Sequence, residues 1–561
     1  MSDHDASILG SVATSPIHAD ANVSQNQRKP LDVLNLYSKT GDTLWGLVES
    51  RAAVRRDEPF LLSGNDTMGW MTFHNKVLRV ASMLTAQAIK RGDRVAIMAS
   101  NSMEYVVLFF STARIGAIFV PVNPDLGVSE AHHIFKHAKP SIVFCTNATR
   151  KVAVEACGAA DPYPKFVSLD EECDGGSDYK SLVDHASTAI SLPDPSPDDT
   201  CLILYTSGTT GLPKGVMHSQ RNYVVAAEGF VERLYLQPED RLLCILPFFH
   251  TNGLVYSLGG ASAAGGSLVI APRFSASNFW RLAEQSGATQ VNIIAAVGRI
   301  LARRPREEFV PSHKIRKVYG VPITPDIYDT FRNDFGVPNL VEGYGMTEVP
   351  GVCSIPFDGP GKVGSMGCAA LHPDHSRRFA EMRVVGKDLQ DVPDGEVGQL
   401  LVRTPIVMQG YWNDPEATAA AFHDGWFLTG DLARRDQDGF YTFIARQKDI
   451  IRRRGENISG AELDQIINQL PGVEAAATIG VESELGEEEI LVAIVKKAGA
   501  TLTAQDVRNW CEQRLSAIKI PRFLIFMDSL PYTPTHRIAK FVLKQDLTLR
   551  GRAIELRVNH R

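Results

Sequence analysis

One segment of the chain combines the residue types that bind a polyphosphate. Tyr205-Thr-Ser-Gly-Thr-Thr-Gly-Leu-Pro-Lys-Gly-Val216 follows an apolar strand and holds three glycines, four serine or threonine residues and one lysine. Glycines let backbone N–H groups converge on an anion, and Lys214 adds a point charge. The Gly-x4-Gly-Lys-Ser/Thr spacing of a Walker loop is absent, so this is a phosphate loop of another kind, or else a plain surface loop. The residues expected to contact phosphate are Thr206, Ser207, Gly208, Thr209, Thr210, Gly211 and Lys214.

Three more segments carry polar residues suited to catalysis. A Tyr-Gly-Met-Thr-Glu string ends at Glu348, and Mg²⁺ prefers carboxylates together with phosphate oxygens. A Thr-Gly-Asp string ends at Asp431, whose carboxylate could accept two neighbouring hydroxyls. His250 follows two phenylalanines. Each has an ordinary alternative: a solvated carboxylate, a turn residue and a packed imidazole.

The composition is that of an ordinary globular protein. Of 561 residues, 44% are hydrophobic and 22% are charged, which excludes a fibrous repeat or long-range disorder. The length suggests three or four domains, or one large domain and one small domain. The net charge of −6 argues against a nucleic-acid surface over the whole protein and leaves only a local basic patch open.

The sequence also restricts where the protein is expected to be. No stretch reaches the roughly 18 consecutive apolar residues of a membrane span. Residues 1–35 are polar, lack the apolar core of a secretory signal and are interpreted as a flexible tail. The eight cysteines form no Cys-x-x-Cys pair, which indicates free thiols in a reducing compartment. We therefore expect a cytoplasmic protein.

Helices alternate with short apolar strands before about Cys368. The strands are expected at 94–98, 118–122, 141–145, 201–205, 242–246 and 267–270. This alternation predicts parallel sheets covered by helices on both faces. The pattern then becomes β-rich, at 381–385 and 398–403, which suggests a small barrel or meander. Beyond Arg446 a short α+β segment follows, with a capping box at Ser459, strands at 475–481 and 489–495, and a helix at 506–515.

The phosphate-loop string resembles that of the adenylate-forming (AMP-binding) superfamily, which includes acyl-CoA synthetases, peptide-synthetase adenylation domains and beetle luciferases. The strings that end at His250, Glu348 and Asp431 follow in the family's order. They are followed by Ala445-Arg-Gln-Lys-Asp449, which is similar to the hinge motif, and by Gly455-Glu-Asn-Ile-Ser459. Within the acyl-CoA synthetase branch, the strings look most similar to crotonobetaine/carnitine-CoA ligases and fatty-acyl-CoA ligases.

This resemblance implies a role for each matched residue. Glu348 and Thr209 would hold Mg²⁺, Thr347 would contact the α-phosphate, and His250 would line the acyl pocket and gate the path of the thiol. Lys448 would be the hinge. The remaining nucleotide and coenzyme A contacts would come from Gly320, Val321, Pro322, Glu342, Gly343, Tyr344, Gly345, Met346, Asp431, Arg446 and Gly455.

One position departs from the family pattern. The C-terminal motif normally reads Pro-x-Thr-x-x-Gly-Lys, and its lysine serves adenylation. Here the string from Leu530 to Lys540 places Arg537 at the lysine position and His536 at the glycine position. A guanidinium is planar and permanently charged, so Arg537 could still stabilise developing negative charge. Lys540 is not the expected substitute, because the family usually has its own basic residue there.

The predicted fold is α/β: a large N-terminal domain of doubly covered sheets with a β-barrel-like subdomain, hinged to a small C-terminal α+β domain. The predicted boundaries are 1–35 for the tail, 36–445 for the AMP-binding domain, 446–449 for the hinge and 450–561 for the mobile domain.

The implied function is that of an acid–thiol ligase using ATP, Mg²⁺ and coenzyme A. It would activate a carboxylic acid as acyl-AMP, release pyrophosphate and pass the acyl group to coenzyme A. Three alternatives stay open: transfer to a carrier protein or amine, a luciferase-like oxygenase, and a nucleotide-binding regulator whose adenylation is impaired by Arg537. The sequence does not name the acid. No nucleic-acid partner or membrane span is expected, and a homodimer is left open.

Overall fold

The fold is known from a computed structural model, which describes residues 16–17, 27–158, 160, 162–170, 177–187, 192, 194–206, 213–453, 456–482, 488–532 and 538–556. The contacts between residues divide the chain into two compact units. The larger unit comprises Met1–Thr206, Pro213–Met382 and Val402–Phe427. The smaller unit comprises Ser207–Leu212, Arg383–Leu401 and Leu428–Arg561.

The first sheet of the larger unit has eight strands, in the order β21-β10-β9-β5-β4-β6-β7-β8. Their bounds are β4 (Arg94–Met98), β5 (Ile118–Val122), β6 (Ile142–Cys145), β7 (Lys165–Ser168), β8 (Ser177–Asp178), β9 (Thr200–Thr206), β10 (Lys214–Ser219) and β21 (Gly410–Tyr411). The pairs from β9 to β8 are parallel, whereas β10 is antiparallel to both of its neighbours. The predicted strands at 94–98 and 118–122 are confirmed with the same bounds.

The second sheet has nine strands, in the order β18-β16-β15-β14-β13-β11-β12-β2-β3. Their bounds are β2 (Pro59–Ser63), β3 (Asp66–Gly69), β11 (Arg241–Cys244), β12 (Ser267–Ile270), β13 (Gln290–Ile294), β14 (Lys317–Val321), β15 (Asn339–Met346), β16 (Val349–Ser354) and β18 (Cys368–Ala369). The strands from β15 to β2 run parallel, so their carboxyl ends lie along one edge of the sheet. Buried Leu243, Val291 and Val318 show why these strands read as continuous apolar runs.

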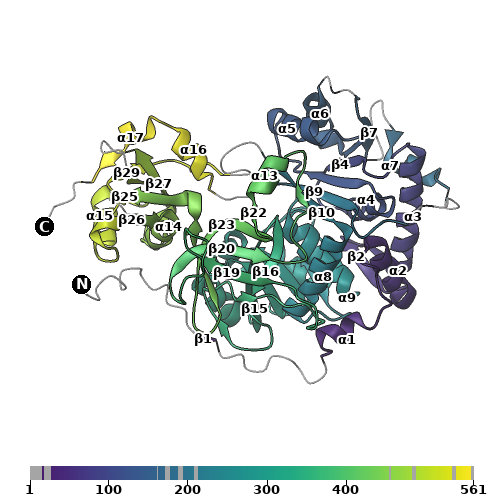
Figure 1. The fold of residues 1–561 in the computed structure, drawn as a ribbon, viewed down its shortest axis with the longest axis horizontal. Coiled ribbons are helices and arrows are strands. Elements are labelled where there is room, and N and C mark those ends of the chain that lie inside the picture. The colour runs from purple at the N-terminus through teal and green to yellow at the C-terminus, as the bar shows by residue number, and fades with distance from the viewer. Residues whose placement is uncertain are drawn as a thin grey trace. The chain divides into compact units, whose positions relative to one another are not determined.

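Helices cover the sheets of the larger unit, as the sequence pattern predicts (Figure 1). Ser102 caps α4 by accepting the N–H of Tyr105 at 3.1 Å, as expected for a residue with a short hydroxyl side chain. The helices are α1 (Pro30–Leu34), α2 (Leu44–Arg55), α3 (Trp70–Ala86), α4 (Met103–Arg114), α5 (Val128–Ala138), α6 (Asn147–Cys157), α7 (Tyr179–Asp184), α8 (Gln220–Leu234), α9 (Gly259–Ala264), α10 (Phe279–Ser286), α11 (Ala295–Ala302), α12 (Pro325–Asp329) and α13 (Pro415–Ala420). Val33 of α1 is fully buried, so ordered structure begins inside the predicted tail.

A five-stranded sheet follows, in the order β19-β20-β23-β22 with β24 beside β23. Its strands are β19 (Glu381–Val385), β20 (Val397–Arg403), β22 (Phe422–His423), β23 (Trp426–Arg435) and β24 (Tyr441–Arg446). It is the β-rich subdomain that the sequence predicts. The division between the two units passes through its strands, which is earlier than the predicted hinge at 446–449. The hinge itself remains a prediction.

The rest of the smaller unit is α+β. The hairpin β25 (Ile450–Arg453) and β26 (Glu456–Ser459) precedes a sheet of β27 (Val473–Glu482), β28 (Glu488–Lys496), β29 (Phe523–Phe526) and β30 (Ile554–Glu555). The helices are α14 (Gly460–Asn468), α15 (Ala504–Glu512), α16 (Lys540–Gln545) and α17 (Leu549–Arg552). Ser459 caps α14 as predicted, accepting the N–H of Glu462 at 3.1 Å. Within the described ranges of both units, no helix combines the length and apolarity that a membrane crossing needs.

Candidate active site

The described ends of the predicted phosphate loop form a fixed hairpin base. Thr206 and Lys214 pair across β9 and β10. On α5, His133 Nε2 donates to the carbonyl of Pro213 at 2.9 Å, and His137 Nδ1 shares a 2.9 Å hydrogen bond with the hydroxyl of Tyr205. Two histidines one helical turn apart therefore hold both sides of the hairpin. The loop residues between its strands, Ser207, Gly208, Thr209, Thr210 and Gly211, lie outside the described residues.

Thr347 and Glu348 form the turn between β15 and β16, where Met346 pairs with Val349. His218 of β10 donates from Nε2 to the carbonyl of Thr347 at 2.7 Å. The N–H of Met408 donates to the carbonyl of Glu348 at 2.8 Å. The turn that carries both predicted catalytic residues is thus held by two other segments of the larger unit.

Glycines of this hairpin allow the two strands to approach closely. A Cβ on Gly345 would lie 2.3 Å from the backbone nitrogen of Gly351, and one on Gly343 would lie 2.4 Å from the hydroxyl of Tyr319. Any side chain at either position would displace backbone or a buried ring. Gly345 of the Tyr-Gly-Met-Thr-Glu string, and Gly343 just before it, are therefore needed for the shape of the hairpin.

Tyr411, which belongs to none of the predicted motifs, contacts both Lys214 and Glu348. Its hydroxyl donates to Glu348 Oε1 at 2.9 Å, and Lys214 Nζ lies 4.8 Å from its ring centroid. Glu348 is only 7% exposed. The structure therefore brings together, around one tyrosine, the cation and the carboxylate that two separate motifs predict.

The segments predicted to pack against adenine lie at the carboxyl ends of β14 and β15. Gly320 pairs with Glu342 across these two strands. A Cβ on Gly320 would lie 2.5 Å from Ile323 Cγ1, so the glycine allows the chain after β14 to fold back. Burial raises the pKa of Glu342 well above its usual value. The carboxyl edge of parallel strands is where ligands bind in open α/β sheets.

His250 lies in a rigid turn after β11. Its ring centroid is 4.4 Å from that of Phe249, and the N–H of Phe248 donates to Asn101 Oδ1 at 2.9 Å. A Cβ on Gly253 would lie 2.4 Å from the carbonyl oxygen of Pro247. A π-helix, η1 (Asn252–Leu258), follows directly, and such helices are frequent at functional sites. The gating role of His250 remains a prediction.

In the smaller unit, Asp431 and Arg446 are direct cross-strand neighbours on β23 and β24. Arg446 Nε lies 3.5 Å from Asp431 Oδ1, and Asp431 is 3% exposed. Thr429 Oγ1 accepts the N–H of Asp431 at 3.1 Å and donates to the carbonyl of Leu400 at 2.7 Å. Gly430 has φ of +69°, which disfavours a side chain. The local structure thus explains the residue type at each position of the Thr-Gly-Asp string.

The Arg-Arg-Arg run before Gly455 has at least one structural member. Arg453 is 3% exposed, lies 2.7 Å from Glu489 and donates to the carbonyls of Ile518 and Ile520 at 2.7 and 2.9 Å. Gly455 lies outside the described residues, and so does the side chain of Lys448. Arg453 is therefore a buried structural cation of the smaller unit.

Arg537 and His536 also lie outside the described residues. Their neighbour Lys540 is described, and its Nζ lies 2.5 Å from Asp464 Oδ2. Asp464 also accepts the N–H of Thr478 at 2.5 Å. Lys540 thus already has a structural partner, which agrees with the expectation that it does not substitute for the family lysine.

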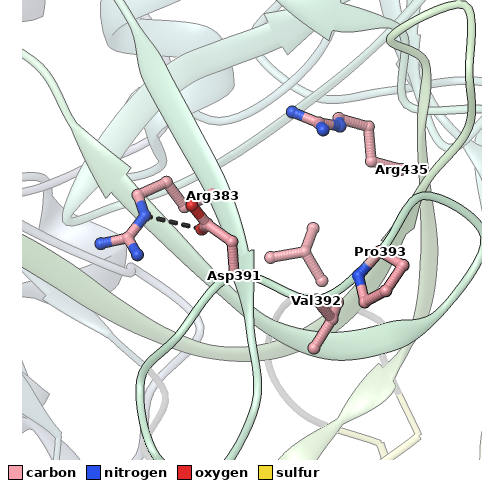
Figure 2. Close-up of a pocket in the computed structure, with 6 residues that line it drawn as sticks. Arg383, Asp391, Val392, Pro393 and Arg435 are labelled. Atoms are coloured by element: carbon pink, nitrogen blue, oxygen red, sulfur yellow. Dashed lines mark hydrogen bonds and ion pairs between the residues drawn. The ribbon is translucent and has the colours of Figure 1, made fainter.

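A small pocket in the smaller unit contains none of the predicted site residues (Figure 2). Arg383 and Arg435 lie on opposite sides of it, and each donates to a nearby carboxylate: Arg383 to Asp391 at 2.7 Å and Arg435 to Asp394 at 2.6 Å. Both cations are paired, so the pocket offers no unbalanced charge to a ligand.

Comparison with known protein families identifies the family of the chain. The sequence profile of the AMP-binding enzymes matches residues 48–412, and that of the AMP-binding enzyme C-terminal domain matches residues 462–537. The chain belongs to the AMP-binding enzymes. The predicted family is thereby confirmed.

Relatives of this AMP-binding enzyme are acyl-CoA ligases. It is 34% identical to the indoleacetate–CoA ligase of Aromatoleum aromaticum over 84% of its own chain and 91% of the relative. It is 32% identical to the sulfoacetate–CoA ligase of Cupriavidus necator, over 90% and 97%. The ATP-bound crystal structure of MatB from Rhodopseudomonas palustris matches with a TM-score of 0.81 and 28% identity, over 90% and 98%. The predicted α/β fold and the predicted activity, ATP-dependent acyl-CoA ligation through acyl-AMP, are confirmed.

The buried His218 makes the AMP-binding enzyme sensitive to acid. Burial lowers the pKa of His218 from 6.5 to about 4, so its neutral form stabilises the fold above pH 6.5 and this contribution is lost as pH falls toward 4. The loss amounts to about 3 kcal/mol. In His218→Gln an amide that does not titrate can donate to Thr347. Urea unfolding at several pH values measures the free energy of unfolding of both proteins. We expect the parent to lose more of this free energy than His218→Gln as the pH falls from 6.5 to 4; equal losses would contradict the role of His218.

Proposed function

We propose that the larger unit of this acyl-CoA ligase carries out adenylation around Lys214, Tyr411 and Glu348. The observation that carries the proposal is the arrangement of these three residues beside the base of the predicted phosphate loop. Lys214 supplies positive charge for ATP phosphates, Thr347 contacts the α-phosphate, and the segments from Gly320 and Glu342 bind adenine. In the smaller unit, the Asp431–Arg446 pair binds ribose.

The donor set around Glu348 suits Mg²⁺. Its carboxylate is buried, and one oxygen already accepts a hydrogen bond that fixes its orientation. A hard cation that prefers carboxylate and phosphate oxygens fits this group together with ATP. Glu348 and Thr209 are the residues proposed to hold it. When bound, Mg²⁺ supplies positive charge that balances the phosphate oxygens.

The chemistry follows from this placement. A carboxylate oxygen of the acid attacks the α-phosphorus, the new O–P bond forms, and the bond to pyrophosphate breaks with its electron pair. In the second step the sulfur of coenzyme A attacks the acyl carbon and loses its proton to solvent, and the C–O bond to AMP breaks with its electron pair staying on AMP. The rate gain comes from positioning and fixed charge, because no covalent enzyme intermediate is needed. Arg537 is proposed to serve the first step and Gly455 the second.

The substrate is a carboxylic acid whose class the relatives leave open. They are named for indoleacetate, sulfoacetate, oxalate and long-chain fatty acids, which share only the carboxylate. A screen that measures AMP release with ATP, Mg²⁺ and coenzyme A over these acids identifies the class. AMP release that depends on one acid and on coenzyme A supports the proposal, and ADP release with every acid contradicts it.

The cellular location is proposed from the thiols. Among the described residues, Cys157, Cys201, Cys244, Cys353 and Cys511 have free thiols. Free thiols support a reducing compartment, and we propose the cytoplasm.

Glu348→Gln tests the proposed metal site. The amide keeps the size of the side chain and an acceptor for Tyr411, but it loses the charge that Mg²⁺ prefers. We expect the Mg²⁺ concentration for half-maximal ATP–pyrophosphate exchange to rise at least about tenfold, since altering even a neighbour of a metal ligand typically has that effect. An unchanged Mg²⁺ dependence would show that Glu348 is not a ligand.

A further inference from the structure

Tyr411 makes two contacts that differ in chemistry. Its hydroxyl donates to the buried carboxylate of Glu348 at 2.9 Å. The ammonium group of Lys214 lies over the face of the same ring, 4.8 Å from the centroid. A hydrogen bond to a carboxylate fixes one of its two oxygens, and the negative face of an aromatic ring attracts a cation. One side chain thus acts on two groups of opposite charge.

Tyr411 is itself held in place by the fold. It pairs with Val216 across β21 and β10, two residues along the strand from Lys214. Its N–H donates to Thr418 Oγ1 at 2.9 Å. The following residue, Trp412, donates its N–H to the carbonyl of Gly215 at 2.7 Å. The strand pairing and these two hydrogen bonds fix the backbone of Tyr411 relative to the base of the predicted phosphate loop.

The start of α13 supports this backbone from the other side. Asp414 caps the helix by accepting the N–H of Ala417 at 3.0 Å, and Pro415 occupies its first turn. Thr418 of the same helix donates from Oγ1 to the carbonyl of Asp414 at 2.8 Å. The helix start and the sheet edge together leave the ring of Tyr411 between the Lys214 strand and the Glu348 turn.

We infer that Tyr411 is a positioning residue that sets the ammonium group of Lys214 and the carboxylate of Glu348 for Mg·ATP. This inference rests on the proposed function. The hydroxyl orients the carboxylate toward the metal, and the ring holds the exposed lysine near the sheet edge. The two contacts are separable by mutation, because phenylalanine keeps the ring and loses only the hydroxyl.

Tyr411→Phe is the first test, with binding rather than turnover as the measurement. Isothermal titration calorimetry is performed on the full chain with ATP plus Mg²⁺, and with ATP plus EDTA, in the absence of acid and coenzyme A. We expect Mg·ATP binding to weaken about 10- to 100-fold, the usual effect of removing the hydrogen bond that orients a metal ligand. Metal-free ATP binding should stay unchanged. A role in folding alone would not separate the two titrations.

Tyr411→Leu removes the ring as well. Metal-free ATP binding is then expected to weaken about two- to fivefold, as expected for the loss of a cation–π contact to Lys214. Tyr235→Phe is the matched control, because Tyr235 also donates to a carboxylate of the larger unit, Asp358, at 3.5 Å. This control should bind ATP like the parent in both titrations.

Two results would overturn the inference. Either Tyr411→Phe binds Mg·ATP as tightly as the parent, or Tyr235→Phe loses as much affinity as Tyr411→Phe. A parent protein that neither binds Mg·ATP nor exchanges pyrophosphate would instead overturn the proposed function, and the inference with it. A double mutant with Glu348→Gln adds an internal check: the hydroxyl should no longer affect the Mg²⁺ dependence once the carboxylate charge is gone.

Discussion

Lys214→Ala is expected to slow acyl-AMP formation by about 10²–10³-fold, the usual cost of removing a charge-stabilising donor from a transition state. Negative charge shifts onto the α-phosphate and the leaving pyrophosphate in this step, and Lys214 is an exposed cation at the base of the phosphate loop. The measurement is ATP–pyrophosphate exchange with the acid identified by screening. Thiol transfer from supplied acyl-AMP should fall much less, because pyrophosphate has already left.

The fold should tolerate the substitution. The backbone of Lys214 keeps its strand pairing and the hydrogen bond from the Thr206 hydroxyl, and loss of the cation–π contact with Tyr411 at an exposed site costs about 0.5–1 kcal/mol. Urea unfolding therefore separates stability from catalysis. Equal losses in both half-reactions, together with a large loss of stability, would make Lys214 a structural residue.

Arg537→Ala is expected to depress acyl-AMP formation by a similar factor, on the order of 10²–10³. Arg537 is predicted to take the position of the family lysine, and the nearby Lys540 is already paired with Asp464 at 2.5 Å. No replacement cation is therefore expected from Lys540. Thiol transfer from supplied acyl-AMP should continue at close to the parent rate, because the residue is proposed to serve only the first half-reaction.

Arg537→Lys separates charge from shape. Activity near that of the parent would mean that a single cation suffices, whereas a loss close to that of the alanine variant would mean that the site requires the planar guanidinium. If Arg537→Ala forms acyl-AMP as fast as the parent, the residue is a bystander. The hypothesis of a regulator impaired by Arg537 would then lose its basis as well.

Local patterns predicted much of the fold and of the site. Strands such as 118–122 are short, fully buried and apolar, so that their pattern is visible in a few residues. Ser102 and Ser459 cap helices through bonds to residues three positions ahead, which the sequence shows directly. Glycines mark the Glu348 turn because a Cβ on Gly345 has no room.

Contacts between segments that are far apart in the sequence could not be predicted. Tyr411 matters because β21 pairs with β10, and nothing near Tyr411 in the chain encodes that partner. The only local signal is Gly410-Tyr-Trp ahead of the capped helix at Asp414. His218 lies on β10, and its hydrogen bond joins this strand to the Thr347 carbonyl in the turn between β15 and β16, a contact that no local pattern shows. In the arginine run, burial of Arg453 depends on carbonyls at 518 and 520, which charge patterning cannot reveal.

The central claim is that a carboxylate oxygen of the substrate attacks the α-phosphorus of ATP. Oxygen-isotope transfer tests it most directly: the acid identified by screening is labelled with ¹⁸O in its carboxylate and converted with ATP, Mg²⁺ and coenzyme A. The account predicts AMP that carries one labelled oxygen in its phosphate, because the bridging oxygen stays with AMP when the thiol attacks the acyl carbon. Label found in inorganic phosphate or pyrophosphate, with unlabelled AMP, would contradict it.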